Sequence, residues 1–222
     1  IPTGVSVAAI MPVDRDEAEW GDLQIVFATT QGDVRRNRLS DFTNVRSNGK
    51  IAMKLPEGVE LVNARICSEN DDVMLTTNSG RAIRFASTDL RVMNSRASTG
   101  VRGIRLTGDD MVVSMSVIRH FEATPEERAA YLKMRRALAG VTDEEAGEDD
   151  VPADPNFSQE RYEEMAAVEN LILTITRGGS GKLSSSHDYP VRGRGGMGVA
   201  AMDKAMRGGP VVASFPVELV DQ

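Results

Sequence analysis

The sequence predicts an all-β, propeller-like fold of repeated four-stranded blades, and two observations support this prediction. First, one unit occurs three times: an apolar, β-rich run ends at a threonine, meets a turn glycine, and a second glycine opens another β-rich run. These sets are Thr29, Gly32 and Gly49, then Thr77, Gly80 and Gly100, then Thr176, Gly179 and Gly198. The copies recur at about 50 residues or about twice that, a period typical of arrays in which one unit forms one blade.

Second, β-branched and apolar residues alternate between glycine, aspartate and asparagine turns, which predicts four strands in each copy. The first complete blade covers residues 23–68, with strands at 23–29, 33–39, 50–55 and 60–66. The second covers residues 69–119, with strands at 72–77, 81–86, 101–106 and 111–118. The third lies within residues 169–222, with strands at 170–176, 181–185, 198–202 and 210–216.

Both ends of the chain are similar to incomplete parts of the same array. Residues 1–22 are expected to hold the end of a preceding blade, since VSVAAIMPV (5–13) corresponds to the last strand of the later copies. Residues 219–222 are similar to the entry into a further blade, and the first residue is not Met. We therefore expect a fragment of a longer array, in which each blade relies on its neighbours.

Residues 120–168 interrupt the repeats with a different pattern. A helix is expected over 124–138, because Thr124 is a suitable N-cap, Pro125 suits the first helical position and Glu127 completes a capping box. An acidic stretch with prolines (142–155) and a second helix (158–169) follow. The segment is about one repeat long, so a degenerate blade is an alternative. A helical insertion is favoured because β alternation and the threonine–glycine turn are both missing.

Charge is distributed unevenly along the chain. The formal net charge is −7, yet residues 120–167 hold 13 acidic and 5 basic residues, whereas the remainder holds 20 acidic and 21 basic residues. The repeats themselves are therefore slightly basic, and the insertion supplies the acidity.

Basic side chains recur at similar places in the three copies, after the first turn and around the second glycine. If the copies stack around an axis, these side chains lie on one rim, where they can bind the phosphates of duplex DNA. The alternative is an ordinary solvated strand edge, since Lys and Arg also prevent edge-to-edge pairing. The candidates are Arg35, Arg36, Arg38, Arg46, Lys50, Lys54, Arg81, Arg84, Arg96, Arg102, Arg105, Lys182, Arg192, Arg194 and Lys204.

The sequence contains no recognisable catalytic or metal-binding constellation. The RGGSGK stretch (177–182) lacks the spacing of a phosphate-binding P-loop, and SSSHD (184–188) favours turn or capping roles over a catalytic triad. Cys67 is the single cysteine, so no internal disulfide forms, and it is expected to be a buried small hydrophobe in a cytoplasmic protein. No apolar run is long enough to span a membrane.

Several stretches resemble, in order, the C-terminal domain of the A subunit of bacterial DNA gyrase. Together they cover nearly the whole chain outside residues 120–168. They are FATTQGDVRRNRLSDF (27–42), GKIAMKLPEGVELV (49–62), VMLTTNSGRAIRF (73–85), STGVRGIRLTGDDMVVSMSV (98–117) and LILTITRGGSGKLSSSHDYPV (171–191). The related topoisomerase IV subunit has a similar domain and is the alternative, but the contiguous TGVRGIRL stretch (99–106) favours gyrase.

The resemblance implies a β-pinwheel, a propeller-like disc whose blades exchange strands with their neighbours, with duplex DNA wrapped around its basic rim. It also implies partnership with the rest of the gyrase A subunit and with the gyrase B subunit in an A2B2 heterotetramer, in which ATP and Mg²⁺ support negative supercoiling. The cleaving tyrosine and the ATP site of that family lie outside this domain. No catalytic residue, metal or cofactor is therefore expected within this chain.

The chain departs from the family pattern in two ways. The family has a QRRGGKG-like box in its first blade, whereas the similar RGRGGMG (192–198) lies in the last copy and has Gly193 and Met197 at positions where basic residues are favoured. We interpret it as the equivalent loop of a later blade. The acidic helical insertion is not a general family feature, and it keeps open a second hypothesis, a propeller-like protein-interaction module.

Overall fold

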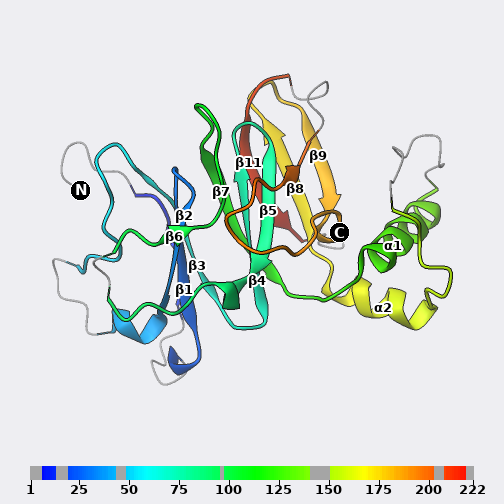
Figure 1. Ribbon diagram of the computed structural model, residues 1–222, viewed down its shortest axis with the longest axis horizontal. Helices are drawn as coiled ribbons and strands as arrows, with labels where there is room; N and C mark the ends of the chain where they lie inside the picture. The colour runs from blue at the N-terminus through cyan, green and yellow to red at the C-terminus, as the bar shows by residue number, and fades with distance from the viewer. Residues whose placement is uncertain are drawn as a thin grey trace.

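The computed structural model describes residues 7–13, 20–43, 49–95, 98–140, 151–202 and 208–218. Three antiparallel sheets follow one another along the molecule, and two helices lie at the end next to the third sheet (Figure 1). The first repeat supplies β1 (Gln24–Thr29), β2 (Asp33–Arg38) and β3 (Leu61–Cys67). The second supplies β4 (Asp71–Thr77), β5 (Arg81–Ala86), β6 (Val101–Arg102) and β7 (Val112–Arg119). The third supplies β8 (Leu171–Thr176), β9 (Gly181–Ser185), β10 (Val199–Ala200) and β11 (Val211–Val217).

Strand exchange between neighbouring repeats completes the first two sheets. The first sheet has the order β3-β1-β2-β6, and the second has the order β10-β5-β4-β7. The fourth strand of each sheet therefore comes from the following repeat: β6 pairs with β2, and β10 pairs with β5. Among the described residues the third sheet has the order β11-β8-β9. This arrangement confirms the expected pinwheel, and it means that a blade in space is not identical to one copy of the sequence repeat.

The threonine–glycine turn has the same hydrogen bonds in all three repeats. The turn glycine donates its N–H to the threonine carbonyl oxygen, over 2.9 Å at Thr29 and Thr77 and 3.0 Å at Thr176. The threonine Oγ1 then accepts from the N–H four residues later, over 3.2 Å in each case. The glycine φ angles of 81°, 75° and 84° lie in the left-handed region that side chains rarely adopt. These hydrogen bonds join residues that are close in the sequence, so the motif can be recognised from the sequence alone.

A glycine marks each place where an exchanged strand enters the neighbouring blade. A Cβ atom on Gly100 would overlap the carbonyl oxygen of Val34, and one on Gly198 would overlap that of Ala82. Just beyond, Gly103 N–H donates to Gly32 O over 2.8 Å, and the equivalent Ala201 N–H donates to Gly80 O over 2.9 Å. The second glycine of the repeat thus permits a close backbone approach between blades.

Four of the expected strands differ from the structure. The ones expected at 101–106 and 198–202 shorten to two residues each, because the backbone then leaves the ladder and bonds to the preceding repeat's turn. Residues 50–55 form no strand and pair with no sheet among the described residues. The closing strand expected at 5–13 is also wrong, since described residues 7–13 are irregular.

The apolar cores lie between repeats as much as within them. One cluster joins Val26 and Val34 of the first repeat to Leu75, Phe85 and Ile104 of the second. Another joins second-repeat residues to third-repeat residues, namely Met74, Ala82, Ile118, Ile172, Tyr189 and Ala201. Each blade is therefore stabilised by its neighbour, as expected for a repeat array.

The insertion is helical, as expected, and packs on the third blade. Helix α1 (Pro125–Leu138) begins with the expected capping box: Thr124 Oγ1 accepts from Glu127 N over 3.1 Å, and Glu127 Oε2 accepts from Thr124 N over 2.8 Å. Tyr131 of α1 and Met165 of α2 (Gln159–Val168) are buried. His187, in the 3-10 turn η4 (Ser186–Asp188), places Nε2 3.0 Å from the carbonyl oxygen of Met165.

Within the described ranges, no helix has the length and apolar character needed to cross a membrane.

We predict that Gly198→Ala destabilises the fold by about 2 to 4 kcal/mol, because it adds a left-handed backbone penalty to a steric overlap with the neighbouring blade. Gly58→Ala is the control, since Gly58 has a φ of 73° but no atom within 4 Å of its added Cβ. That control should lose only about 1 kcal/mol. Equal losses of unfolding free energy in urea for the two variants would contradict the close approach.

We also predict that Cys67 is unreactive in the folded protein. The thiol is buried, and burial raises its pKa to about 12, so almost no thiolate forms at pH 8. A thiol reagent such as DTNB should modify Cys67 only at the rate of unfolding, and denaturant should accelerate the reaction. Rapid modification without denaturant would show that the strand β3 opens locally.

Candidate nucleic-acid interface

The segment between η4 and β10 brings arginines of two repeats together. This segment crosses from the third blade onto the second blade, where Gly195 N–H donates to Gly103 O over 2.6 Å and Arg105 N–H donates to Gly196 O over 2.8 Å. Arg194 donates from Nη1 to the carbonyl oxygen of Arg102 over 3.0 Å. Arg102, Arg105 and Arg194 are all exposed, and together we call them the arginine cluster.

In the arginine cluster, hydrogen bonds to the second blade position the backbone, while the guanidinium groups are exposed to solvent. Arg194 also donates from Nε to Asp89 O over 3.2 Å, so two carbonyl groups position its side chain. Arg102 stands opposite Asp33 in the β2–β6 pair. Burial raises the pKa of Asp33, and Arg102 partly offsets that rise. The cluster places three guanidinium groups at an exposed surface, which suits a polyanionic ligand.

Three of the predicted rim residues are wrong, because they are buried. The exposed fractions of Arg35, Arg36 and Arg84 are 0%, 4% and 2%. Arg35 donates from Nε to Asn37 Oδ1 over 2.6 Å and from Nη1 to the carbonyl oxygen of Ser98 over 2.6 Å. A guanidinium enclosed to this extent is not accessible to DNA, so these three residues are not part of a DNA-binding rim.

Arg84 joins the second blade to the third blade and to the insertion. Its Nε is 2.7 Å from Asp72 Oδ2, Nη1 donates to Ser186 O over 2.8 Å, and Nη2 donates to Arg119 O over 3.0 Å. The other Asp72 oxygen is 2.6 Å from Nδ1 of His120, the residue with which the insertion begins. Arg84 therefore bonds directly to β4, β7 and η4, and the Asp72 carboxylate also links it to His120.

The other predicted rim residues have different surroundings. Arg81 is half-buried and donates to the carbonyl oxygens of Met197 and Gly198, so it holds the segment entering β10. Lys50 is half-buried and donates to the carbonyl oxygens of Asp41 and Thr43. The exposed candidates outside the arginine cluster are Arg38, Lys54, Lys182 and Arg192. Three candidates lie outside the described residues: Arg46, Arg96 and Lys204.

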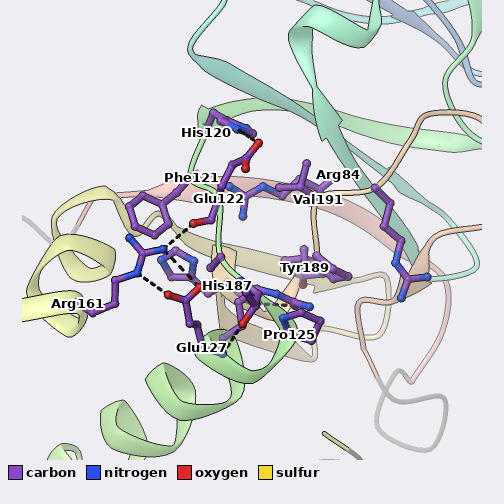
Figure 2. Close-up of a pocket in the computed structure, with 15 residues that line it drawn as sticks. Arg84, His120, Phe121, Glu122, Pro125, Glu127, Arg161, His187, Tyr189 and Val191 are labelled. Carbon is purple, nitrogen blue, oxygen red and sulfur yellow. Dashed lines mark hydrogen bonds and ion pairs between the residues drawn. The ribbon is translucent and has the colours of Figure 1, made fainter. Parts of the chain in front are cut away.

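Sequence reasoning missed a cleft between the insertion and the repeats. The cleft has a volume of about 670 Å³, and its walls come from β5, the segment 120–124, α1, α2, η4 and the segment after η4 (Figure 2). At one wall Arg161 pairs with Glu127 over 2.8 Å and lies 4.6 Å from the Phe121 ring centre. Its hydrogen bond lowers the pKa of Glu127, and burial lowers the pKa of His187 nearby. The sequence repeats do not indicate this cleft, because the insertion that forms part of it has no counterpart in the repeats.

No site for a metal ion emerges from the residues that the structure describes. Within these ranges, no three His, Cys, Asp or Glu side chains are close enough to bind one.

We predict that Arg84→Met destabilises the protein by about 3 to 5 kcal/mol, because it removes the guanidinium that pairs with the buried Asp72 carboxylate. Arg102→Met removes an exposed arginine and should change stability by about 0.5 kcal/mol or less. The urea unfolding midpoints of the two variants provide the measurement. A double variant, Arg84→Met with Asp72→Leu, should recover part of the loss, and equal small effects of both single variants would refute the structural role.

The repeats match the model of the family described as DNA gyrase C-terminal domain, beta-propeller, over residues 24–68, 71–119 and 170–216. The chain is 48% identical over 225 residues to the DNA gyrase A subunit of Granulibacter bethesdensis, covering 95% of this chain and 24% of that protein. It is 42% identical over 218 residues to the DNA gyrase A subunit of Rickettsia bellii, covering 97% of this chain and 24% of that protein. The chain thus spans about a quarter of the length of these curated relatives.

Solved structures support the fold. The C-terminal domain of DNA topoisomerase IV matches with a TM-score of 0.61 at 16% identity, over 94% of this chain and 53% of that one. The E. coli ParC C-terminal domain matches with a TM-score of 0.54 at 16% identity, over 89% of this chain and 63% of that one. At this identity the likeness concerns the fold alone, whereas the much higher sequence identities are to gyrase subunits. Because the family model matches all three repeats and more than half of the residues, this chain belongs to the DNA gyrase C-terminal domain family.

Proposed function

We propose that this chain binds duplex DNA through the phosphate backbone, without sequence specificity, and bends it around the basic edge of the array. The observation that carries the proposal is the arginine cluster, in which strand exchange brings exposed guanidinium groups of two repeats to one place. Guanidinium groups bind phosphate strongly, and they carry no base-specific information when they contact only the backbone. Aromatic residues make up 5% of the chain, which argues against a base-stacking platform for single strands.

We further propose that the chain acts within a DNA gyrase, where the wrapped DNA is presented for ATP-driven strand passage that introduces negative supercoils. In this proposal the partners are the rest of the gyrase A subunit and the gyrase B subunit, assembled as A2B2. ATP and Mg²⁺ act in other parts of that assembly, and this chain contributes no catalytic residue. The site of action is the bacterial cytoplasm, where the chromosome lies. The support is the family membership and the similarity to gyrase subunits.

We predict that reversing two charges of the cluster, with Arg102→Glu and Arg105→Glu together, weakens the binding of a linear duplex at least tenfold, because it removes phosphate contacts and adds repulsion. A control for charge reversal outside the cluster is the single variant Arg65→Glu, since Arg65 is exposed on β3, at the opposite edge of the sheet from β6. Fluorescence anisotropy with a labelled duplex of about 40 base pairs measures the difference. A protein-interaction module would bind the duplex equally in all three proteins.

Salt dependence tests the same proposal independently. Each phosphate neutralised by the protein should contribute about −0.9 to the slope of log affinity against log salt concentration. Binding measured between 50 and 200 mM salt, about a fourfold range, should therefore weaken steeply. Binding to the whole protein that does not depend on salt would contradict backbone recognition.

A further inference from the structure

Three arginines from different parts of the chain face the cleft between the insertion and the repeats. They are Arg84 of β5, Arg128 of α1 and Arg192 of the segment that crosses toward β10. Arg192 N–H donates to Arg84 O over 2.9 Å, so the crossing segment and β5 are directly bonded at this point. Arg128 Nη1 lies 3.5 Å from the carbonyl oxygen of His187, so the Arg128 side chain extends from α1 toward η4. Tertiary structure alone produces this grouping.

Most charges at the cleft are already paired, but two are not. Arg84 pairs with Asp72, and Arg161 pairs with Glu127 and Glu164. Glu122 is 90% exposed, and its Oε1 is 3.7 Å from His120 Nε2. Among the described residues no carboxylate lies within ion-pair distance of Arg128 or Arg192. The cleft therefore presents two guanidinium groups that have no ion-pair partner among the described residues.

The position of Arg128 is electrostatically costly without a ligand. Partial burial lowers the pKa of its guanidinium, and the nearby charges of Arg192 and Arg84 lower it further, whereas Asp188 and Glu126 act in the opposite direction. Like charges held together in a partly desolvated place repel one another. An anion that bound between Arg128 and Arg192 would relieve this repulsion.

We propose that Arg128 and Arg192 together bind a backbone phosphate of the DNA that the arginine cluster binds, so that the insertion extends the DNA path. The proposal rests on the proposed function of the chain, and it assigns a role to the insertion, which has no counterpart in the repeats. Two features favour DNA over a small phosphorylated molecule. Arg192 is exposed to solvent, and it lies two residues before Arg194 of the arginine cluster.

Arg192 and Arg194 are close enough in the chain to contact one DNA strand. Two residues of chain span at most about 7 Å. A strand that contacts Arg194 is therefore within reach of Arg192 and, across the mouth of the cleft, of Arg128. The insertion then places one positive charge, that of Arg128, beside the rim, although its sequence as a whole is acidic.

The test compares Arg128→Ala with Lys133→Ala in the whole protein that carries this chain. Lys133 is exposed, belongs to the same helix and does not line the cleft, so it controls for the loss of one positive charge. Arg128→Ala should weaken duplex binding roughly three- to tenfold and reduce the magnitude of the salt slope by about 1, since one phosphate contact is lost. Lys133→Ala should change neither quantity. Equal effects of the two variants would overturn the proposal.

Two further variants separate a loss of DNA binding from a loss of folding. Arg192 is exposed, so Arg192→Ala should leave the urea unfolding midpoint unchanged, and Arg128→Lys should restore part of the affinity by restoring the charge. If both arginines hold one phosphate, the losses of Arg128→Ala and Arg192→Ala are not additive in a double-mutant cycle. Additive losses would show that the two side chains do not share a phosphate.

Inorganic pyrophosphate distinguishes a small anion from DNA. If pyrophosphate bound to the wild type but not to Arg128→Ala, while duplex affinity remained equal, the cleft would be a small-anion site and the proposal would be wrong. If the proposed function itself is wrong, a different result is expected. In that case the Arg102→Glu, Arg105→Glu double variant would also bind the duplex as the wild type does.

Discussion

The structure depends on the exchange of one short strand between neighbouring blades. Two residues of each exchanged strand pair with the preceding sheet, and the backbone that follows bonds to the preceding turn. The close approach requires a glycine at the entry point, because a Cβ atom there would overlap a carbonyl oxygen of the neighbouring strand. The same crossing segments carry the exposed arginines. Strand exchange therefore both joins the blades and builds the charged surface.

Arginine has two separate roles in this molecule, and burial distinguishes them. Arg84 is enclosed and satisfies three acceptors from three elements, so it joins blades rather than contacting a ligand. Its repeat equivalent, Arg36, is also buried, and Gln24 occupies in the first repeat the position that Asp72 holds in the second. The rim arginines instead lie on the crossing segments, where the backbone is held but the guanidinium groups reach solvent.

The insertion is integrated into the array rather than attached loosely to it. Tyr131 and Met165 bury apolar surface against the third blade, and Tyr131 stacks on Tyr162 with ring centres 5.0 Å apart. His120 contacts the same Asp72 that pairs with Arg84. These contacts place α1 at a defined position beside the crossing segment, which is why one of its arginines faces the cleft with Arg192.

The sequence by itself determined the features that rest on interactions within a few residues. The threonine–glycine turns, most long strands and the capping box at Thr124 all follow from local hydrogen bonds and side-chain alternation. Only the tertiary structure decided which strands complete each sheet, which arginines are buried and where the insertion lies. Those outcomes depend on contacts between residues far apart in the chain, such as Arg84 with Ser186 or Arg194 with Arg102. No local pattern distinguishes a buried arginine from an exposed one on neighbouring strands, because burial is conferred by the adjacent blade.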